Sequence, residues 1–81
     1  MVGERLQAAR MAQGLDLESV AEATKLRASL IAAIEAGDFD VFGGDAYVRG
    51  HLRAIAMVVG LDPEDIVDQY VRENPGEPPI P

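Results

Sequence analysis

Side chains able to catalyse a reaction or bind a metal are scarce in this chain. It has a single histidine, His51, and no cysteine, so a thiolate nucleophile and a cysteine-based metal site are both excluded. The main group of acids follows Leu-Asp-Pro, a pattern typical of a helix start, and it lacks the loop of a calcium-binding hand. Its members are Asp62, Glu64, Asp65 and Asp68. We therefore predict that the protein is not an enzyme and uses no cofactor or metal.

Side chains suited to nucleic-acid contacts gather around residues 25–29. Lys25, Arg27 and Ser29 are the candidates for contacts with phosphates or base edges. Glu18 and Glu22 are close by and would repel a phosphate backbone, and the adjoining alanines offer no hydrogen bond to a base. The formal net charge of −7 also opposes phosphate binding. A DNA-binding regulator that uses these three residues is therefore the alternative hypothesis.

A second candidate surface lies within residues 46–59, where apolar residues form two adjacent stripes on one predicted helix. The first stripe, which we expect to face the core, consists of Val48, Leu52, Ala56 and Val59. The second consists of Tyr47, His51, Ala54, Ile55 and Val58. Five short helices offer little area to bury both, so the second stripe is expected to bind a partner. Arg49 and Arg53, four residues apart on a third side, would meet a partner's acids or neutralise the domain's own.

Helices must position these residues, because apolar side chains recur every three to four residues along the chain. The fold class is all-α: we predict five helices and no strand. The predicted helices cover residues 3–13, 17–24, 27–37, 46–59 and 63–74. The second and third, joined by the short turn Thr24-Lys25-Leu26, form a helix-turn-helix.

The helix ends are marked by capping residues. Asp16, Asp45 and Asp62 are the expected N-caps, because a carboxylate there accepts hydrogen bonds from free amides of the first turn. Gly14, Gly37 and Gly60 are the expected ends of the first, third and fourth helices. Gly50 falls inside a predicted helix, where we expect another helix to pack closely against it, with close approach of a partner as the alternative.

The remaining segments are a loop and a tail. Phe39 and Phe42 lie in the loop after residue 37, and we expect both rings to pack against the core. Residues 1–74 are predicted to form one helix-turn-helix interaction domain, and residues 75–81, with four of the five prolines, a stiff linker or disordered tail. The longest apolar run, residues 54–59, falls short of the roughly 20 needed to span a bilayer. We expect a cytoplasmic protein.

The sequence resembles the helix-turn-helix of phage repressors in the run Leu6…Arg10…Gly14-Leu15…Val20-Ala21…Ile34-Glu35-Ala36-Gly37. In that family the arginine of the first helix commonly pairs with the glutamate that ends the third. The resemblance therefore implies a structural ion pair between Arg10 and Glu35.

A closer resemblance is to the cytoplasmic domain of the RodZ family of bacterial cell-shape proteins. It is carried by GERLQAAR, LDLESVAEATKLRASLIAAIEAGDFD and GDAYVRGHLRAIAMVVGLDPEDIVDQY, and it covers residues 3–71. The resemblance implies a five-helix domain that binds the actin-like protein MreB and is tethered to the membrane by a segment absent from this chain. Together with the proline-rich stretch, it suggests a piece placed at the cytoplasmic face of the inner membrane.

The family resemblance also points to a binding site. Aromatic residues on the fourth helix contact the actin-like partner in that family. Tyr47 matches the first such position, whereas His51 stands where the family often has tyrosine or phenylalanine, and Ile55 where a further tyrosine is common. We predict an actin-like cytoskeletal protein of the MreB type, or another cell-division or wall-synthesis protein, as the partner. The predicted partner-binding residues are Tyr47, Arg49, His51, Arg53 and Ile55.

Overall fold

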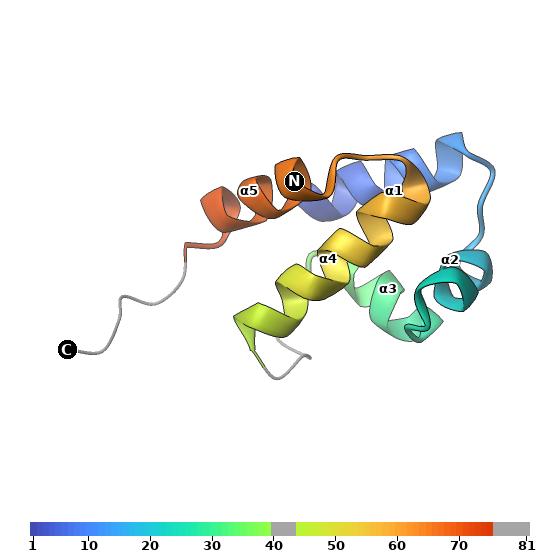
Figure 1. The fold of residues 1–81 in the computed structure, drawn as a ribbon, viewed down its shortest axis with the longest axis horizontal. Helices are drawn as coiled ribbons and strands as arrows, with labels where there is room; N and C mark the ends of the chain where they lie inside the picture. The colour runs from blue at the N-terminus through green and yellow to red at the C-terminus, as the bar shows by residue number, and fades with distance from the viewer. Residues whose placement is uncertain (40–43, 76–81) are drawn as a thin grey trace.

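The computed structural model describes residues 1–39 and 44–75. Its helices are α1 (Val2–Ala12), α2 (Leu17–Thr24), α3 (Ala28–Glu35), α4 (Asp45–Val59) and α5 (Pro63–Glu73), as Figure 1 shows. The described residues contain no strand, so the prediction of a five-helix, all-α fold is confirmed. Of the predicted linker or tail, residues 75–81, all but the first residue lie outside the described part, so it stays a prediction.

The predicted caps of α2 and α5 are confirmed. A carboxylate oxygen of Asp16 accepts a hydrogen bond from the Ser19 amide at 2.8 Å. Asp62 accepts one from the Glu64 amide at 3.0 Å. Both helices therefore begin where a local carboxylate satisfies an amide that has no partner inside the helix.

The predicted cap of α4 is wrong. Gly44 is the N-cap, and Asp45 is the first residue of the helix. The Asp45 carboxylate instead accepts a hydrogen bond from the hydroxyl of Tyr70 in α5, at 2.9 Å. The third helix is also shorter than predicted, because Arg27 takes the N-cap position and the helix ends at Glu35.

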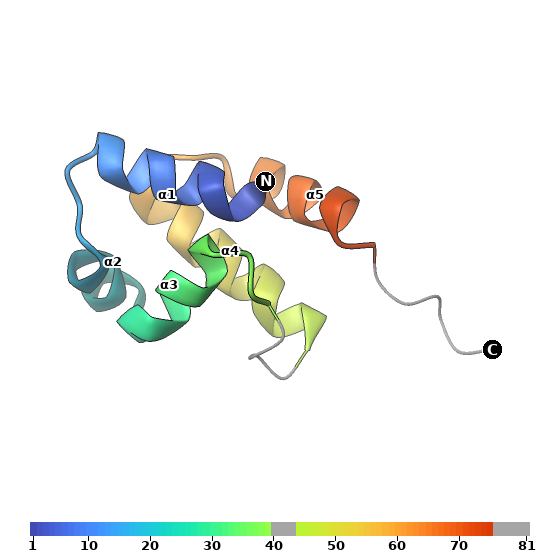
Figure 2. The same ribbon diagram turned by 180° about the vertical axis from the view of Figure 1, so that it is seen from behind.

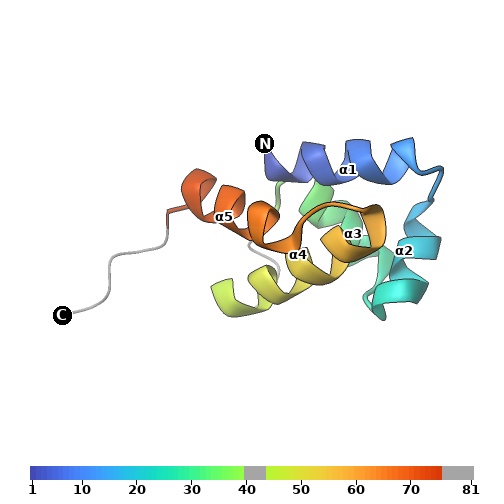
Figure 3. The ribbon, with the colours of Figure 1, turned by 45° about the horizontal axis from the view of Figure 1, so that its top comes forward.

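One core is shared by all five helices. In Figures 1 and 2, α2 and α3 lie at one end of the molecule and α5 at the other. Figure 3 shows α1 and α5 on the same side of α4, which contacts α1, α2 and α5. The buried apolar residues are Val2, Leu6, Val20, Ile31, Ile34, Val48, Leu52, Ile55, Ala56, Val59, Ile66, Val67 and Tyr70. The fourth helix contributes five of them, more than any other helix, so its orientation is set by the core.

A buried ion pair joins α1 to the end of α3. Arg10 donates from Nε to Glu35 Oε2 at 2.7 Å and from Nη2 to Oε1 at 3.0 Å. A third donor, Nη1, reaches the carbonyl of Leu15 at 2.9 Å. The hydrogen bonds with Glu35 raise the pKa of Arg10 above its ordinary value. One guanidinium thus fixes α1, the chain before α2 and the end of α3 together.

Close packing at the start of α1 requires a glycine. A Cβ added at Gly3 would lie 2.5 Å from the carbonyl oxygen of Ile34 and 2.6 Å from that of Glu35. These are backbone atoms of α3, so relief of the contact would need movement of a helix. The absence of a side chain at Gly3 therefore lets α1 approach the ion-paired end of α3.

The loop after α3 is held by one aromatic ring. Phe39 is half-buried against the core, and its ring meets that of Tyr70 edge to face with the centroids 5.1 Å apart. Packing of Phe39 is therefore confirmed. Phe42 lies outside the described residues.

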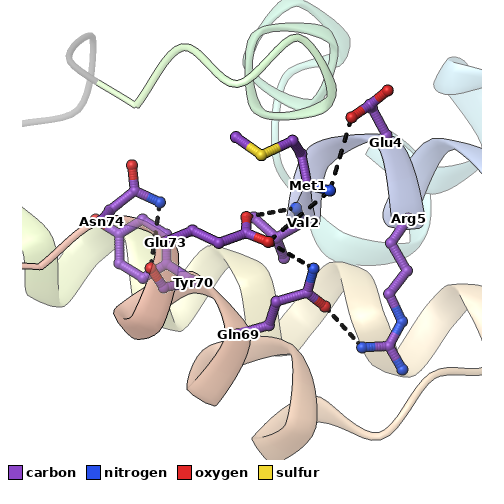
Figure 4. A network of polar contacts seen from close by, with 8 residues as sticks. All are labelled: Met1, Val2, Glu4, Arg5, Gln69, Tyr70, Glu73 and Asn74. Carbon is purple, nitrogen blue, oxygen red and sulfur yellow. Dashed lines mark hydrogen bonds and ion pairs between the residues drawn. The ribbon is translucent and has the colours of Figure 1, made fainter.

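Polar contacts join α5 to the start of α1 (Figure 4). Glu73 accepts hydrogen bonds from the Val2 amide and from Gln69 Nε2, each at 2.8 Å. Arg5 donates to Gln69 Oε1 at 2.8 Å and to Asp65 Oδ2 at 2.6 Å. The bond from Gln69, followed by that from Val2, lowers the pKa of Glu73. Since α1 has no side-chain cap of its own, Glu73 performs this role from another helix.

The ion pair gives a first prediction. Glu35→Ala would leave the Arg10 guanidinium buried without its carboxylate, so we expect the free energy of unfolding to fall by about 3 kcal/mol. Urea denaturation followed by circular dichroism measures it. A loss below about 1 kcal/mol, the usual limit for an exposed ion pair, would contradict the structural role assigned here.

The lowered pKa of Glu73 gives a second prediction. Ionised Glu73 stabilises the fold above its ordinary pKa of about 4.3, and this contribution is lost as the pH falls through the lower folded value. The urea midpoint should therefore decline between about pH 5 and about pH 3, and it should decline less in Glu73→Gln, whose amide does not titrate. The pKa of Asp16 is also lowered, mainly by Ser19, so part of the decline in the urea midpoint remains in both proteins. If the urea midpoint fell equally steeply with pH in the original protein and in Glu73→Gln, the prediction would be contradicted.

Candidate protein-binding surface

The inner side of α4 carries the predicted core stripe. Val48, Leu52, Ala56 and Val59 are all buried, as predicted. Ile55, which the sequence placed on the partner-binding stripe, is also buried, with 1% of its surface exposed. It lies on the helix between Leu52 and Val59, where the neighbouring helices cover it. A partner has no access to Ile55, and it is therefore left out of the candidate surface.

The outer side of α4 carries two large exposed apolar side chains. Tyr47 is 66% exposed and Met57 is 72% exposed. Gly50 and Ala54 lie between them at spacings of three, four and three residues, which places all four on adjacent turns of one side. We call these four residues the outer face of α4. Met57 was not among the residues predicted from the sequence, although its spacing opposite the core stripe was the available signal.

Gly50 is the centre of this face. A Cβ added there would meet no heavy atom within 4 Å. The expectation that another helix packs against Gly50 is therefore wrong, because within the described residues this position faces open space. Because the exposed Gly50 has no side chain, the helix surface is indented between Tyr47 and Met57.

The two arginines of α4 pair with acids of the same chain. Arg49 Nε lies 3.0 Å from Asp45 Oδ2, and Arg53 Nε lies 2.8 Å from Glu64 Oε2. The bond to Glu64 raises the pKa of Arg53. The sequence predicts that these arginines meet a partner's acids or neutralise the domain's own. In the structure both form ion pairs with acids of the same chain. Both stay partly exposed at the edge of the outer face, and His51 is half-buried beside it.

The residues of the DNA-binding alternative lie together at the turn of the helix-turn-helix. Lys25 has a left-handed backbone with φ of 62°, Arg27 is the N-cap of α3, and Ser29 lies in its first turn. All three are exposed, and neither cation forms an ion pair with another described residue. Glu18 and Glu22 line the same open hollow as Lys25 and Arg27. The turn thus combines two available cations with two carboxylates.

The described residues form neither a metal site nor a membrane-spanning helix. Across residues 1–39 and 44–75, no group of three or more histidine or acidic side chains is arranged to hold a metal ion. No helix in the same residues is long and apolar enough to cross a bilayer. The outer face of α4 and the helix-turn-helix corner therefore remain as the two candidate sites.

Several known proteins are similar to this chain. Residues 5–66 match the model of a helix-turn-helix domain family. The cytoskeleton protein RodZ of Streptococcus pneumoniae is 36% identical over 69 residues, which are 85% of this chain and 25% of that protein. The membrane protein YmfM of Bacillus subtilis is 30% identical over 61 residues, covering 75% of this chain and 21% of that protein. This chain therefore spans a quarter or less of these relatives.

A solved structure shares the fold. YmfM of Staphylococcus aureus, a membrane protein proposed to bind DNA, superposes with a TM-score of 0.83 at 27% identity. The match covers 90% of this chain and 89% of the solved one. The helix-turn-helix corner and α4 are thus parts of an architecture that occurs in another protein of this kind.

Alanine substitutions at two glycines should change the free energy of unfolding in opposite directions. We expect Gly50→Ala to raise the free energy of unfolding by about 0.5–1 kcal/mol, because alanine favours the helix and meets no neighbour. Gly3→Ala should lower it by about 1–3 kcal/mol, because the added Cβ overlaps the backbone of α3. Thermal and urea denaturation of both variants measure the changes. Destabilisation by Gly50→Ala would show that this face is covered.

Proposed function

Because this chain belongs to the helix-turn-helix domain family and is homologous to RodZ, we propose that it is the partner-binding module of a RodZ-like cell-shape protein. In this proposal the outer face of α4 docks on an actin-like filament protein of the MreB type. The module acts without catalysis. A segment absent from this chain links it to the membrane, so that the docked filament lies at the cytoplasmic face.

The observation that carries the proposal is the pair of exposed apolar side chains on α4. Tyr47 and Met57 project from a helix whose other side is fully committed to the core. Tyrosine is among the residues that contribute most to protein interfaces, and methionine adapts to the shape of a partner. Gly50 and Ala54 between them allow a partner to approach the helix backbone closely. The face therefore offers apolar burial without loss of core packing.

Charge supports contact with a protein in preference to a nucleic acid. The chain has a formal net charge of −7, and four of its arginines are paired with its own carboxylates, namely Arg5, Arg10, Arg49 and Arg53. A phosphate backbone would find few available cations. Arg49 and Arg53 border the outer face and can exchange their present partners for acids of the docked protein.

DNA binding is the second candidate function, favoured by one observation. Lys25 and Arg27 are exposed, adjacent and without ion pairs among the described residues. The S. aureus relative is also proposed to bind DNA. Ser29 would add a hydrogen bond, whereas Glu18 and Glu22 in the same hollow would repel phosphates. We propose that any binding to a duplex at this corner is weak and independent of sequence.

Co-sedimentation with filaments of the organism's MreB-type protein tests the docking face. Tyr47→Ala and Met57→Ala should each weaken binding about tenfold, a loss of about 1.4 kcal/mol. Arg49→Glu should also weaken it by adding a negative charge. Met11→Ala is the matched control, because Met11 is a methionine 64% exposed on α1. Unchanged sedimentation of the α4 variants, or equal loss with the control, would contradict the assigned surface.

A mobility-shift assay at two salt concentrations tests the DNA-binding candidate. We expect retardation of a duplex near 50 mM salt to disappear near 200 mM and to be equal for unrelated sequences, as expected of contacts with phosphates alone. Lys25→Glu combined with Arg27→Glu should abolish it. Sequence-selective binding that persists at the higher salt would instead favour a transcriptional regulator.

A further inference from the structure

The first turn of α4, which carries Tyr47, has little support of its own. Its N-cap is Gly44, with φ of 151°, and no side chain caps the helix. Asp45, Ala46 and Tyr47 are exposed, and Val48 is the first residue of the helix to enter the core. A turn with so few apolar contacts frays readily unless a tertiary contact holds it.

One side chain from α5 supplies such a contact. The Tyr70 hydroxyl donates to Asp45 Oδ1 at 2.9 Å, while Asp45 Oδ2 lies 3.0 Å from Arg49 Nε. The Tyr70 ring is buried and packs edge to face on Phe39, so its hydroxyl has a fixed position. A hydrogen bond to a carboxylate is stronger than one between neutral groups. The Asp45 carboxylate therefore connects α5 to the first two turns of α4.

We propose that Tyr70 is a positioning residue for the docking face: through Asp45 it holds Tyr47 and Arg49 in the geometry that meets the partner. The inference rests on the proposed function for the identity of the partner. It adds that α5 and the partner site are coupled. A partner that requires an ordered first turn of α4 must stabilise the Tyr70–Asp45 bond, and loss of that bond must weaken partner binding by the same factor.

A separate set of contacts on α5 provides a control. Arg5 of α1 holds α5 through hydrogen bonds to Gln69 and Asp65, and neither bond involves α4. Arg5→Gln therefore loosens α5 from α1 and leaves the Tyr70–Asp45 bond in place. If general loosening of α5 were sufficient to impair docking, this variant would have the same effect as loss of the Tyr70 hydroxyl.

A double-mutant cycle on binding to filaments of the MreB-type protein tests the coupling. Tyr70→Phe keeps the ring and removes the hydroxyl, and we expect it to weaken binding about fivefold, the lower end of typical coupling factors. In the Tyr47→Ala background the same change should have less than about a twofold effect, because the side chain being positioned is gone. Arg5→Gln should leave binding unchanged. An equal effect of Tyr70→Phe in both backgrounds, or no effect, would overturn the proposal.

Hydrogen exchange tests the same inference without a partner. Tyr70→Phe should speed exchange at least about fivefold at the hydrogen-bonded amides of residues 47–49, while Arg5→Gln should leave these amides as in the original chain. If the unmodified chain fails to bind filaments, the proposed function fails and this measurement alone decides the positioning role. Unchanged exchange at residues 47–49 in Tyr70→Phe would then overturn the positioning role.

Discussion

The bidentate ion pair between Arg10 and Glu35 is the contact on which the arrangement of the helices depends. The same guanidinium also binds the carbonyl of Leu15, so it fixes three segments at once. Because both charges are largely removed from water, each needs the other to remain ionised at low energetic cost. Gly3 allows α1 to come close enough for this geometry. With α1 and α3 fixed, α4 packs against α1, α2 and α5 with only one side in the core.

This division of α4 into two sides connects the fold to the proposed function. The inner side is filled by branched apolar residues, and its packing determines which direction the outer side faces. Tyr47 and Met57 are therefore presented by a rigid element. The arginines at the border are held by Asp45 and Glu64, which keeps the face locally neutral. Such a surface suits burial against another protein more than attraction of a polyanion.

Tyr70 extends this connection to the end of the domain. Its ring is part of the core, its hydroxyl holds the start of α4, and α5 is joined separately to α1 through Glu73 and Arg5. The helix nearest to the C-terminal residues is thus attached both to the proposed docking side and to the opposite end of the chain.

The sequence by itself determined the number and kind of the helices and the ends of most of them. Caps such as Asp16 and Asp62 act on amides two or three residues away, so a local pattern is sufficient to predict them. Only the tertiary structure decided which sides of α4 are buried and which are exposed. The cap expected at Asp45 is replaced by a bond to Tyr70, Ile55 is covered by neighbouring helices, and Gly50 is not. From the sequence alone, two apolar stripes on one helix are equivalent candidates for burial. The helices that cover one of them are distant in the sequence, so a local pattern does not reveal which stripe they cover.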